Sequence, residues 1–287
     1  QQSGCDFVVG LGGGSSIDAA KAIAMMATNS GNFWDYVQAG TGGKKPFSVP
    51  GLPLIAIPTT SGTGTEGNRT AVISNPATGE KMGTACDFPA LSLVDPELTL
   101  GISKRYTAFQ GFDALFHSME AFIAVRATPV TDAWALESIR LIFENLPAAV
   151  KDGSNAAARA NLSIASMLAG MEICYAGCTT AHLIEHALSG LVPTLPHGEG
   201  LIMIANAFHR YGAAQIPERY ARMADTIGVT ERGQTIEEKA ESFLAALEEL
   251  KRACEVDDCC LSAHGFSEAD FSNIVKNIYQ IAGGKLV

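Results

Sequence analysis

Apolar residues in the first hundred positions occur in short runs that are separated by glycine-rich or polar turns. Runs of about four to eight such residues predict buried or half-buried strands. Helical periodicity over 16–26 follows the first run and three consecutive glycines. A strand, a glycine turn, a helix and a further strand predict an α/β layer with parallel strands. The runs that predict strands are 6–11, 53–58, 70–74, 82–85 and 91–94.

The pattern changes near residue 102, after which no strand is expected and apolar residues recur with helical spacing. One helix start is well marked, because Thr128 can cap a helix whose first turn contains Pro129. We therefore expect a Rossmann-like α/β domain over residues 1–102, followed by an all-α domain over residues 103–287. The predicted helices begin near 107, run from 129 to about 143, and then span 156–175, 180–188, 200–211, 217–227, 236–250 and 268–281.

Composition excludes several classes of protein. With 47% apolar residues, 17% charged residues and a net charge of −10, the chain is typical of an enzyme without a basic surface. We therefore expect neither nucleic acid nor an anionic membrane as a partner, and no apolar run is long enough to cross a bilayer. The chain begins without a signal-peptide pattern, and its seven cysteines form no CxxC pair. Reduced thiols in the cytoplasm are favoured over a disulfide framework.

Three glycines separate the first predicted strand from the first predicted helix. Gly13, Gly14 and Ser15 lie where the free N–H groups of a helix start face the turn, and an anion such as a pyrophosphate is favoured there. The spacing is not G-x-G-x-x-G, so a tight turn without a ligand remains an alternative. Asp18 either caps this helix or bonds a ribose or nicotinamide group.

A second polar loop follows the second buried strand. Residues 59–65 contain Thr59, Thr60 and Thr63 and are dense in hydroxyl groups. Ligands of open α/β sheets bind at the carboxyl ends of strands, where this loop is expected. A simple polar turn is the alternative, but two such loops at neighbouring strand ends favour one shared cofactor.

The helical part of the chain concentrates groups that can bind a metal ion. Asp113 and His117 are four residues apart and share one face of a helix, and His182, His186 and His197 fall in one short stretch. Carboxylate oxygen and imidazole nitrogen suit Fe(II), Zn or Ni, and the absence of cysteine ligands disfavours a structural zinc site. A surface ion pair and capping or core histidines are the alternatives, but the clustering favours a metal.

Several motifs together resemble the iron-containing (group III) alcohol dehydrogenases, in order over nearly the whole chain. The resemblance implies a nicotinamide-binding α/β domain, an all-α metal-binding domain, an active site in the cleft between them, and a homo-oligomer, a dimer in that family. The motifs are Gly12-Gly13-Gly14-Ser15 with Asp18, Pro58 to Gly64, Val94-Asp95-Pro96-Glu97-Leu98, Asp113-Ala114-Leu115 with His117 and Glu120, Thr131 to Glu137, and Pro196-His197-Gly198.

The same resemblance implies roles for individual residues. The metal ligands of the family fall on Asp113, His117, His182 and His197. His186 matches a histidine close to the substrate that is not a ligand, so it is the candidate catalytic proton carrier, with simple packing as the alternative. The implied dinucleotide contacts are Gly13, Gly14, Ser15, Asp18, Thr59, Thr60, Thr63 and Lys81.

The chain also departs from the common family pattern. Residues 182–190 and 66–68 look more like the butanol dehydrogenase branch, and Gly198-Glu199-Gly200-Leu201 replaces the usual residues after the Pro-His-Gly motif. A doubly wound sheet needs more strands than these to bury both faces. Because family members have strands before the glycine loop and a helix beyond residue 287, we expect the α/β domain to be incomplete and both ends to be truncated.

The expected activity follows from this chemistry. A divalent metal, Fe²⁺ or Zn²⁺, lowers the pKa of a bound alcohol, and a hydride then passes between a primary alcohol or aldehyde and NAD(H) or NADP(H). Maleylacetate reduction and glycerol or polyol oxidation are alternatives, because fold does not decide the substrate. A catalytically inactive fragment that retains only metal binding is an alternative of another class.

Overall fold

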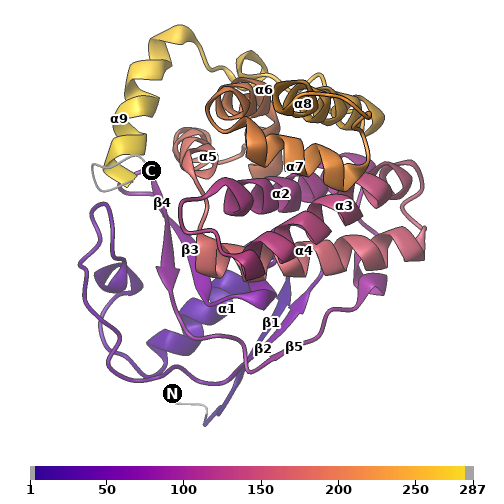
Figure 1. Ribbon diagram of the computed structural model, residues 1–287. Helices are drawn as coiled ribbons and strands as arrows, with labels where there is room; N and C mark the ends of the chain where they lie inside the picture. The colour runs from indigo at the N-terminus through magenta and orange to yellow at the C-terminus, as the bar shows by residue number, and fades with distance from the viewer. Residues whose placement is uncertain (1–3, 282–287) are drawn as a thin grey trace.

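The computed structural model describes residues 4–281 and divides them into a smaller α/β part and a larger helical part (Figure 1). A parallel sheet with the strand order β1-β2-β5 forms the base of the first part. Each residue of β1 pairs with one of β2, from Val8 opposite Leu54 to Gly12 opposite Pro58. The bounds are Val8–Gly12 for β1, Leu54–Pro58 for β2 and Leu91–Ser92 for β5.

Helix α1 (Gly14–Met26) follows β1 directly and packs against the sheet. A Cβ atom on Gly10 would lie 2.9 Å from the Cβ of Ala20, so the glycine lets the helix approach the strand closely. Strand β1 lies at one edge of the sheet, and its side chains Val9 and Leu11 are about half accessible to solvent. The predicted strand, glycine turn and helix are confirmed, with the helix beginning two residues earlier than expected.

Two of the predicted strands do not join the parallel sheet. β3 (Thr70–Asn75) and β4 (Glu80–Ala85) form an antiparallel hairpin with Thr70 opposite Ala85, which corrects the expectation of parallel strands at these positions. The reason is the short connection over 76–79, because parallel neighbours need a crossover of about a dozen residues. The hairpin contacts α1 on one side and helices of the second part on the other.

The second part is a bundle of helices packed around α2, whose phenylalanines Phe112, Phe116 and Phe122 are fully buried. Thr128 caps α3 as predicted, since its hydroxyl accepts a hydrogen bond from the N–H of Thr131. The predicted helix at 268–281 begins instead with a short 3-10 turn. The bounds are α2 Lys104–Ile123, α3 Pro129–Lys151, α4 Ala156–Ala176, α5 Thr180–Leu191, α6 His197–Gln215, α7 Pro217–Ile227, α8 Ile236–Ala253 and α9 Phe271–Ile281.

The chain connects the two parts near residue 102, and packing contacts between them also join them. The domain boundary at residue 102 stays a prediction. Helix α9 contacts both α5 and strand β4, so the end of the described chain returns to the hairpin (Figure 1). Over residues 4–281 no single helix has the length and apolar composition needed to cross a membrane. The pair α4 and α5, bent by 104°, meets that criterion by length and composition alone.

A buried carboxyl group in the first part makes protein stability depend on pH. Glu66 is 4% exposed, and burial raises its pKa to about 7. Below pH 4.5 the folded and unfolded chains both hold this proton, whereas between pH 4.5 and 7 only the folded chain holds it. The free energy of unfolding therefore falls by about 3 kcal/mol as pH rises through this window.

We expect Glu66→Gln to remove this dependence, because the amide fills the same space without ionising. Urea denaturation of both proteins should give similar free energies of unfolding at pH 4.5. At pH 8 the variant should be more stable by about 3 kcal/mol. A difference of the same size at both pH values would show that ionisation of Glu66 is not the cause.

Candidate metal and cofactor site

The two predicted cofactor loops lie side by side at the carboxyl end of the parallel sheet. The N–H of Thr59 donates a hydrogen bond of 2.9 Å to the carbonyl oxygen of Gly12. A Cβ atom on Gly14 would lie 2.6 Å from Cγ2 of Thr63, so only glycine permits this approach. The structure therefore brings together six of the predicted cofactor contacts, which are Gly13, Gly14, Ser15, Thr59, Thr60 and Thr63.

The start of α1 suits an anionic group. Gly13 is the N-cap residue, and within the described part of the chain no side chain caps this helix end. Because the first N–H groups of a helix have no partner within it and the helix dipole is positive there, a phosphate is favoured at this position. Ser15, the second residue of the helix, is exposed.

Asp18 lies away from this opening. Its carboxylate accepts hydrogen bonds from the hydroxyl of Thr65 (2.5 Å) and from the N–H of Val72 (2.9 Å). The neighbouring Lys21 ammonium is 3.8 Å from Asp18 and donates to the carbonyl oxygens of Thr65 and Thr70. These bonds tie α1 to the loop after β2 and to β3. Asp18 lies beyond the first turn of α1 and does not cap it, and its contact with a dinucleotide stays a prediction.

The four predicted metal ligands converge on one point in the helical part. Oδ1 of Asp113 lies 3.6 Å from Nδ1 of His117, 3.6 Å from Nε2 of His182 and 3.4 Å from Nε2 of His197. Oδ1 of Asp113, Nδ1 of His117 and Nε2 of His182 are buried and have no hydrogen-bond partner in the described chain. Buried polar atoms are almost always paired, so this arrangement fits a divalent ion that is held by one carboxylate and three imidazoles.

Helix packing explains why ligands far apart in the sequence meet. Asp113 and His117 project from one face of α2, and His182 lies in the first turn of α5. A Cβ atom on Gly198 would overlap the carbonyl oxygen of Phe109, one helical turn before Asp113. Gly198 therefore lets the start of α6 contact the backbone of α2, which sets the adjacent His197 beside Asp113.

The position of His197 corrects one expectation about secondary structure. The helix predicted over 200–211 begins at His197 and ends at Gln215, with Pro196 as its N-cap residue. The proline does not break this helix, because it stands before the first residue that needs a helical hydrogen bond. His197 is therefore fixed by the first turn of a helix rather than carried by a loop.

The cofactor loop after β2 reaches this cluster. A Cβ atom on Gly62 would lie 3.1 Å from Oδ2 of Asp113, and the N–H of Ser61 donates a hydrogen bond of 3.1 Å to the Gln110 side chain. On its other side the loop packs against α4, where Gly64 and Gly170 approach so closely that neither tolerates a side chain. The loop that carries predicted cofactor contacts therefore lies beside the predicted metal ligand Asp113.

The buried Glu120 fixes the orientation of His182. The sequence alone assigns no role to this glutamate. Oε1 of Glu120 pairs with Nδ1 of His182. Oε2 of Glu120 accepts hydrogen bonds from the N–H (2.6 Å) and the hydroxyl (2.7 Å) of Thr179. The carboxylate thus caps the start of α5 and directs Nε2 of His182 toward Asp113. Glu120 follows His117 by three residues on the same helix face, which is the signal that could have found it.

A second buried glutamate holds His197 in the same way. Glu185 lies on α5, and Oε2 pairs with Nδ1 of His197 and with the Lys81 ammonium at 3.1 Å. Lys81 lies on β4, and Nζ is also 3.2 Å from Nδ1 of His197. The structure therefore places Lys81 beside the predicted metal ligands His197 and Asp113. Carboxylates that bond the second nitrogen of a ligating histidine fix its orientation.

The electrostatics of the cluster favour an ionised Asp113 and a neutral His186. Burial disfavours ionisation of Asp113, but the rings of His117, His197 and His182 outweigh it and lower the carboxyl pKa. Burial, reinforced by the Lys81 charge, holds the pKa of His186 well below its ordinary value, so this ring is neutral near pH 7. The His186 and His197 ring centroids are 5.7 Å apart.

We expect Glu120→Gln to weaken metal binding about 10- to 100-fold, because an amide supports the orientation of His182 less well than a carboxylate does. Titration of the metal-free protein with Zn²⁺ against a competing chelator measures this affinity. Glu66→Gln is the control, since it also neutralises a buried carboxyl and should retain wild-type affinity. Equal affinities for the two variants would contradict the role of Glu120.

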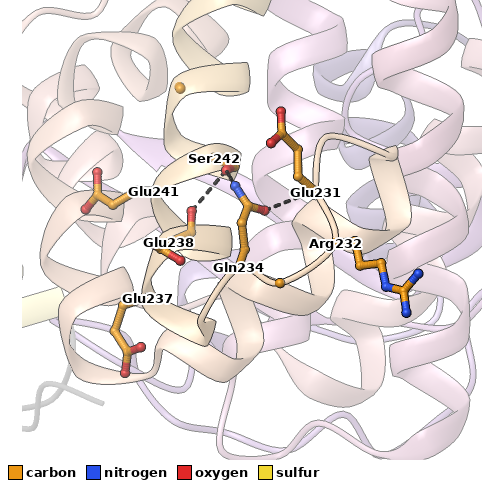
Figure 2. Close-up of a pocket in the computed structure, with 9 residues that line it drawn as sticks. Glu231, Arg232, Gln234, Glu237, Glu238, Glu241 and Ser242 are labelled. Atoms are coloured by element: carbon orange, nitrogen blue, oxygen red, sulfur yellow. Dashed lines mark hydrogen bonds between the residues drawn. The ribbon is translucent and has the colours of Figure 1, made fainter.

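A surface hollow beside α8 does not resemble a second site. It is lined by the loop over 231–234 and by the first turns of α8. Gln234 bonds the backbone of Glu231 and the hydroxyl of Ser242 across it, whereas Glu237 and Glu241 project in other directions (Figure 2). Its carboxylates do not converge on one point as the predicted metal ligands do.

The fold and the site together define a class of enzyme, the metal-dependent alcohol oxidoreductases. The chain belongs to the iron-containing alcohol dehydrogenase family. The model of the family, "Iron-containing alcohol dehydrogenase", matches residues 1–96, and the model of its C-terminal region, "Fe-containing alcohol dehydrogenase family, C-terminal", matches residues 107–285. The predicted family and fold class are confirmed.

Individual relatives agree with this assignment. The chain is 37% identical to 1,3-propanediol dehydrogenase from Klebsiella pneumoniae over 93% of its own length and 68% of the relative. It is 35% identical to NAD-dependent methanol dehydrogenase from Bacillus methanolicus over 98% and 72%. The solved structure of an archaeal alcohol dehydrogenase from a Red Sea brine pool matches with a TM-score of 0.91, 33% identity and coverages of 99% and 73%. The chain thus spans about two thirds to three quarters of these relatives.

Proposed function

We propose that this enzyme interconverts small primary alcohols and aldehydes with NAD(H), at a divalent metal held by Asp113, His117, His182 and His197. The observation that carries the proposal is the set of buried, unpartnered atoms around Oδ1 of Asp113. One negative charge and three neutral imidazoles leave a divalent ion with net positive charge. Such a site suits a substrate oxygen as a further ligand.

Each residue of the site has a separate task in this proposal. The metal, when bound, supplies an electrophile that favours the alkoxide form of the alcohol. Glu120 and Glu185 orient the rings of His182 and His197. His186, which is neutral and half-buried beside His197, accepts the alcohol proton or returns it to the aldehyde.

The glycine and threonine loops supply the other reactant. In the proposal, the start of α1 binds the pyrophosphate of the dinucleotide, and the loop over 59–65 extends the cofactor site to Asp113. We propose NAD(H) rather than NADP(H), and Fe²⁺ rather than Zn²⁺. The NAD-dependent methanol dehydrogenase among the relatives and the iron-containing family support these choices.

The proposed substrates are short alcohols and diols. The support comes from relatives that act on 1,3-propanediol and methanol. We also propose a dimer, on the family resemblance, which light scattering of the purified protein tests by its mass. Oxidation of a panel of alcohols and diols with each nicotinamide cofactor tests the choice of substrate and of dinucleotide.

Metal removal tests the proposed function directly. We expect dialysis against a chelator to abolish NAD⁺ reduction with 1,3-propanediol, and one equivalent of Fe²⁺ added without oxygen to restore it. Binding of NADH, followed by its fluorescence, should remain after metal removal because the two loops do not depend on the ion. A protein that binds the metal but neither nicotinamide cofactor would support the inactive alternative, and full activity without metal would refute the proposal.

A further inference from the structure

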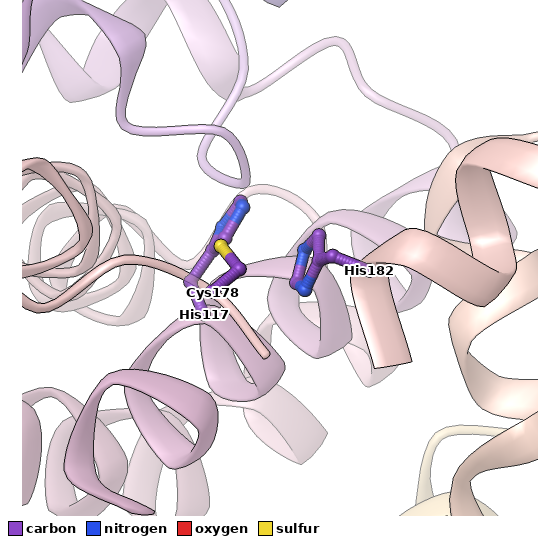
Figure 3. Close-up of side chains that lie close together, drawn as sticks. All are labelled: His117, Cys178 and His182. Carbon is purple, nitrogen blue, oxygen red and sulfur yellow. The ribbon is translucent and has the colours of Figure 1, made fainter. Parts of the chain in front are cut away.

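A second group of donor atoms adjoins the predicted metal ligands. Donor atoms of His117, Cys178 and His182 lie within 4.8 Å of one another. Figure 3 shows the three side chains gathered at one place, with the sulfur of Cys178 beside the His117 ring. His117 and His182 already belong to the proposed metal site, whereas the sequence pattern predicted no sulfur ligand there.

The local fold fixes the position of Cys178. Helix α4 ends at Ala176, and Gly177 turns the chain with a φ of +81°, a conformation that side chains rarely adopt. Thr179, on the other side of the cysteine, is held by its two hydrogen bonds to Glu120. Cys178 therefore lies between the turn at Gly177 and the capped first turn of α5, which together fix its position.

The histidines beside the thiol carry nitrogen atoms that no hydrogen bond of the described chain occupies. Their rings are stacked with centroids 4.3 Å apart, and His117 and His182 are only 6% and 4% exposed. Within the described chain, Nδ1 of His117 and Nε2 of His182 have no hydrogen-bond partner. A thiol beside two buried imidazole rings completes a donor set of a kind that binds Zn²⁺.

We propose that Cys178 is an additional, sulfur ligand of the metal ion bound by Asp113, His117, His182 and His197. This inference rests on the proposed function, because it needs the metal to be at that site. On binding, a sulfur–metal bond forms and the S–H proton passes to water, without any change of oxidation state. The added thiolate balances the positive charge that the Asp113 carboxylate and the three imidazoles leave on the ion.

Cobalt supplies a direct test, because a bound thiolate gives Co²⁺ a charge-transfer absorption in the near ultraviolet that oxygen and nitrogen ligands do not give. We would load the metal-free full chain with one equivalent of Co²⁺ and compare wild type with Cys178→Ser and Cys174→Ser. Cys174 lies one helical turn earlier on α4, so its variant removes a neighbouring thiol as a matched control. We expect the band in wild type and in Cys174→Ser and its loss in Cys178→Ser.

Two further measurements complete the test. Cys178→Ser should still bind one Co²⁺, but on the order of 10- to 100-fold more weakly. Cys178 and Cys260 are both exposed, so in wild type Zn²⁺ should slow alkylation of Cys178 by iodoacetamide while Cys260 reacts at an unchanged rate. One bound Co²⁺ without the band, or a band that survives in Cys178→Ser, would overturn the sulfur ligand and leave the proposed function standing. Wild-type protein that binds no Co²⁺ at all would overturn both.

Discussion

Asp113→Asn is expected to lower kcat/KM by about 10³-fold or more and to abolish stoichiometric metal binding. Asp113 is the only carboxylate among the four proposed ligands, and Oδ1 faces all three histidines at 3.4 to 3.6 Å. A carboxamide has nearly the same shape but no charge, so it neither attracts the cation nor balances it. The predicted loss corresponds to about 4 kcal/mol of transition-state stabilisation, which is the scale of metal catalysis.

Metal analysis, NAD⁺ reduction and thermal unfolding measure this effect together. Asp132→Asn is the matched control, because Asp132 is also buried on a helix and pairs with Arg219 at 2.6 Å. The control should lower stability while keeping one bound metal per chain. If Asp113→Asn retained the metal and wild-type kcat/KM, the proposed ligand set would be wrong.

Gly198→Ala is expected to disable the site although glycine has no side chain to lose. The new methyl group would overlap the carbonyl oxygen of Phe109, so the start of α6 must move away from α2. His197 precedes this glycine and moves with it. A displacement of about 1 Å at a catalytic group costs about 10²-fold in rate, and the crowding itself destabilises the fold by about 1–3 kcal/mol.

A second glycine separates the effect of crowding from the general effect of adding a methyl group. Gly101 is exposed, and a Cβ atom added to it would have no neighbouring atom within 4 Å, so Gly101→Ala should leave kcat/KM and metal affinity unchanged. Comparison of kcat/KM, metal affinity and unfolding temperature for the two variants tests this. Wild-type values for Gly198→Ala would show that the contact between α2 and α6 does not position His197.

The sequence predicted those parts of the site that depend on local pattern. A buried run, three glycines and a helical stretch indicate a phosphate-binding turn, and the structure places the Thr63 side chain against Gly14 there. Spacing of four residues put Asp113 and His117 on one helix face, as observed. Each of these features is contained in a few consecutive residues, where backbone preferences decide the conformation.

The features that the sequence did not predict depend on contacts between distant segments. The ion pair of Lys81 with Glu185 on α5 depends on the hairpin, which brings β4 to that helix. Alternating residues identify β3 and β4 as strands without naming their partners, and the short turn between them decides the antiparallel pairing. Glu120 shares a helix face with His117, but its role, like that of Glu185, arises only because a histidine from another element faces the carboxylate.

The donors of the proposed site stand on three helices, because α2 carries two of them while α5 and α6 carry one each. A bound cation would therefore link these three helices, and a cross-link of this kind between remote parts of a chain stabilises the folded state. With free metal at about a thousand times its Kd, the folded state gains about 4 kcal/mol over the unfolded state. The supply of metal in the cell would then determine how long the protein resists proteolysis, in addition to its catalytic rate.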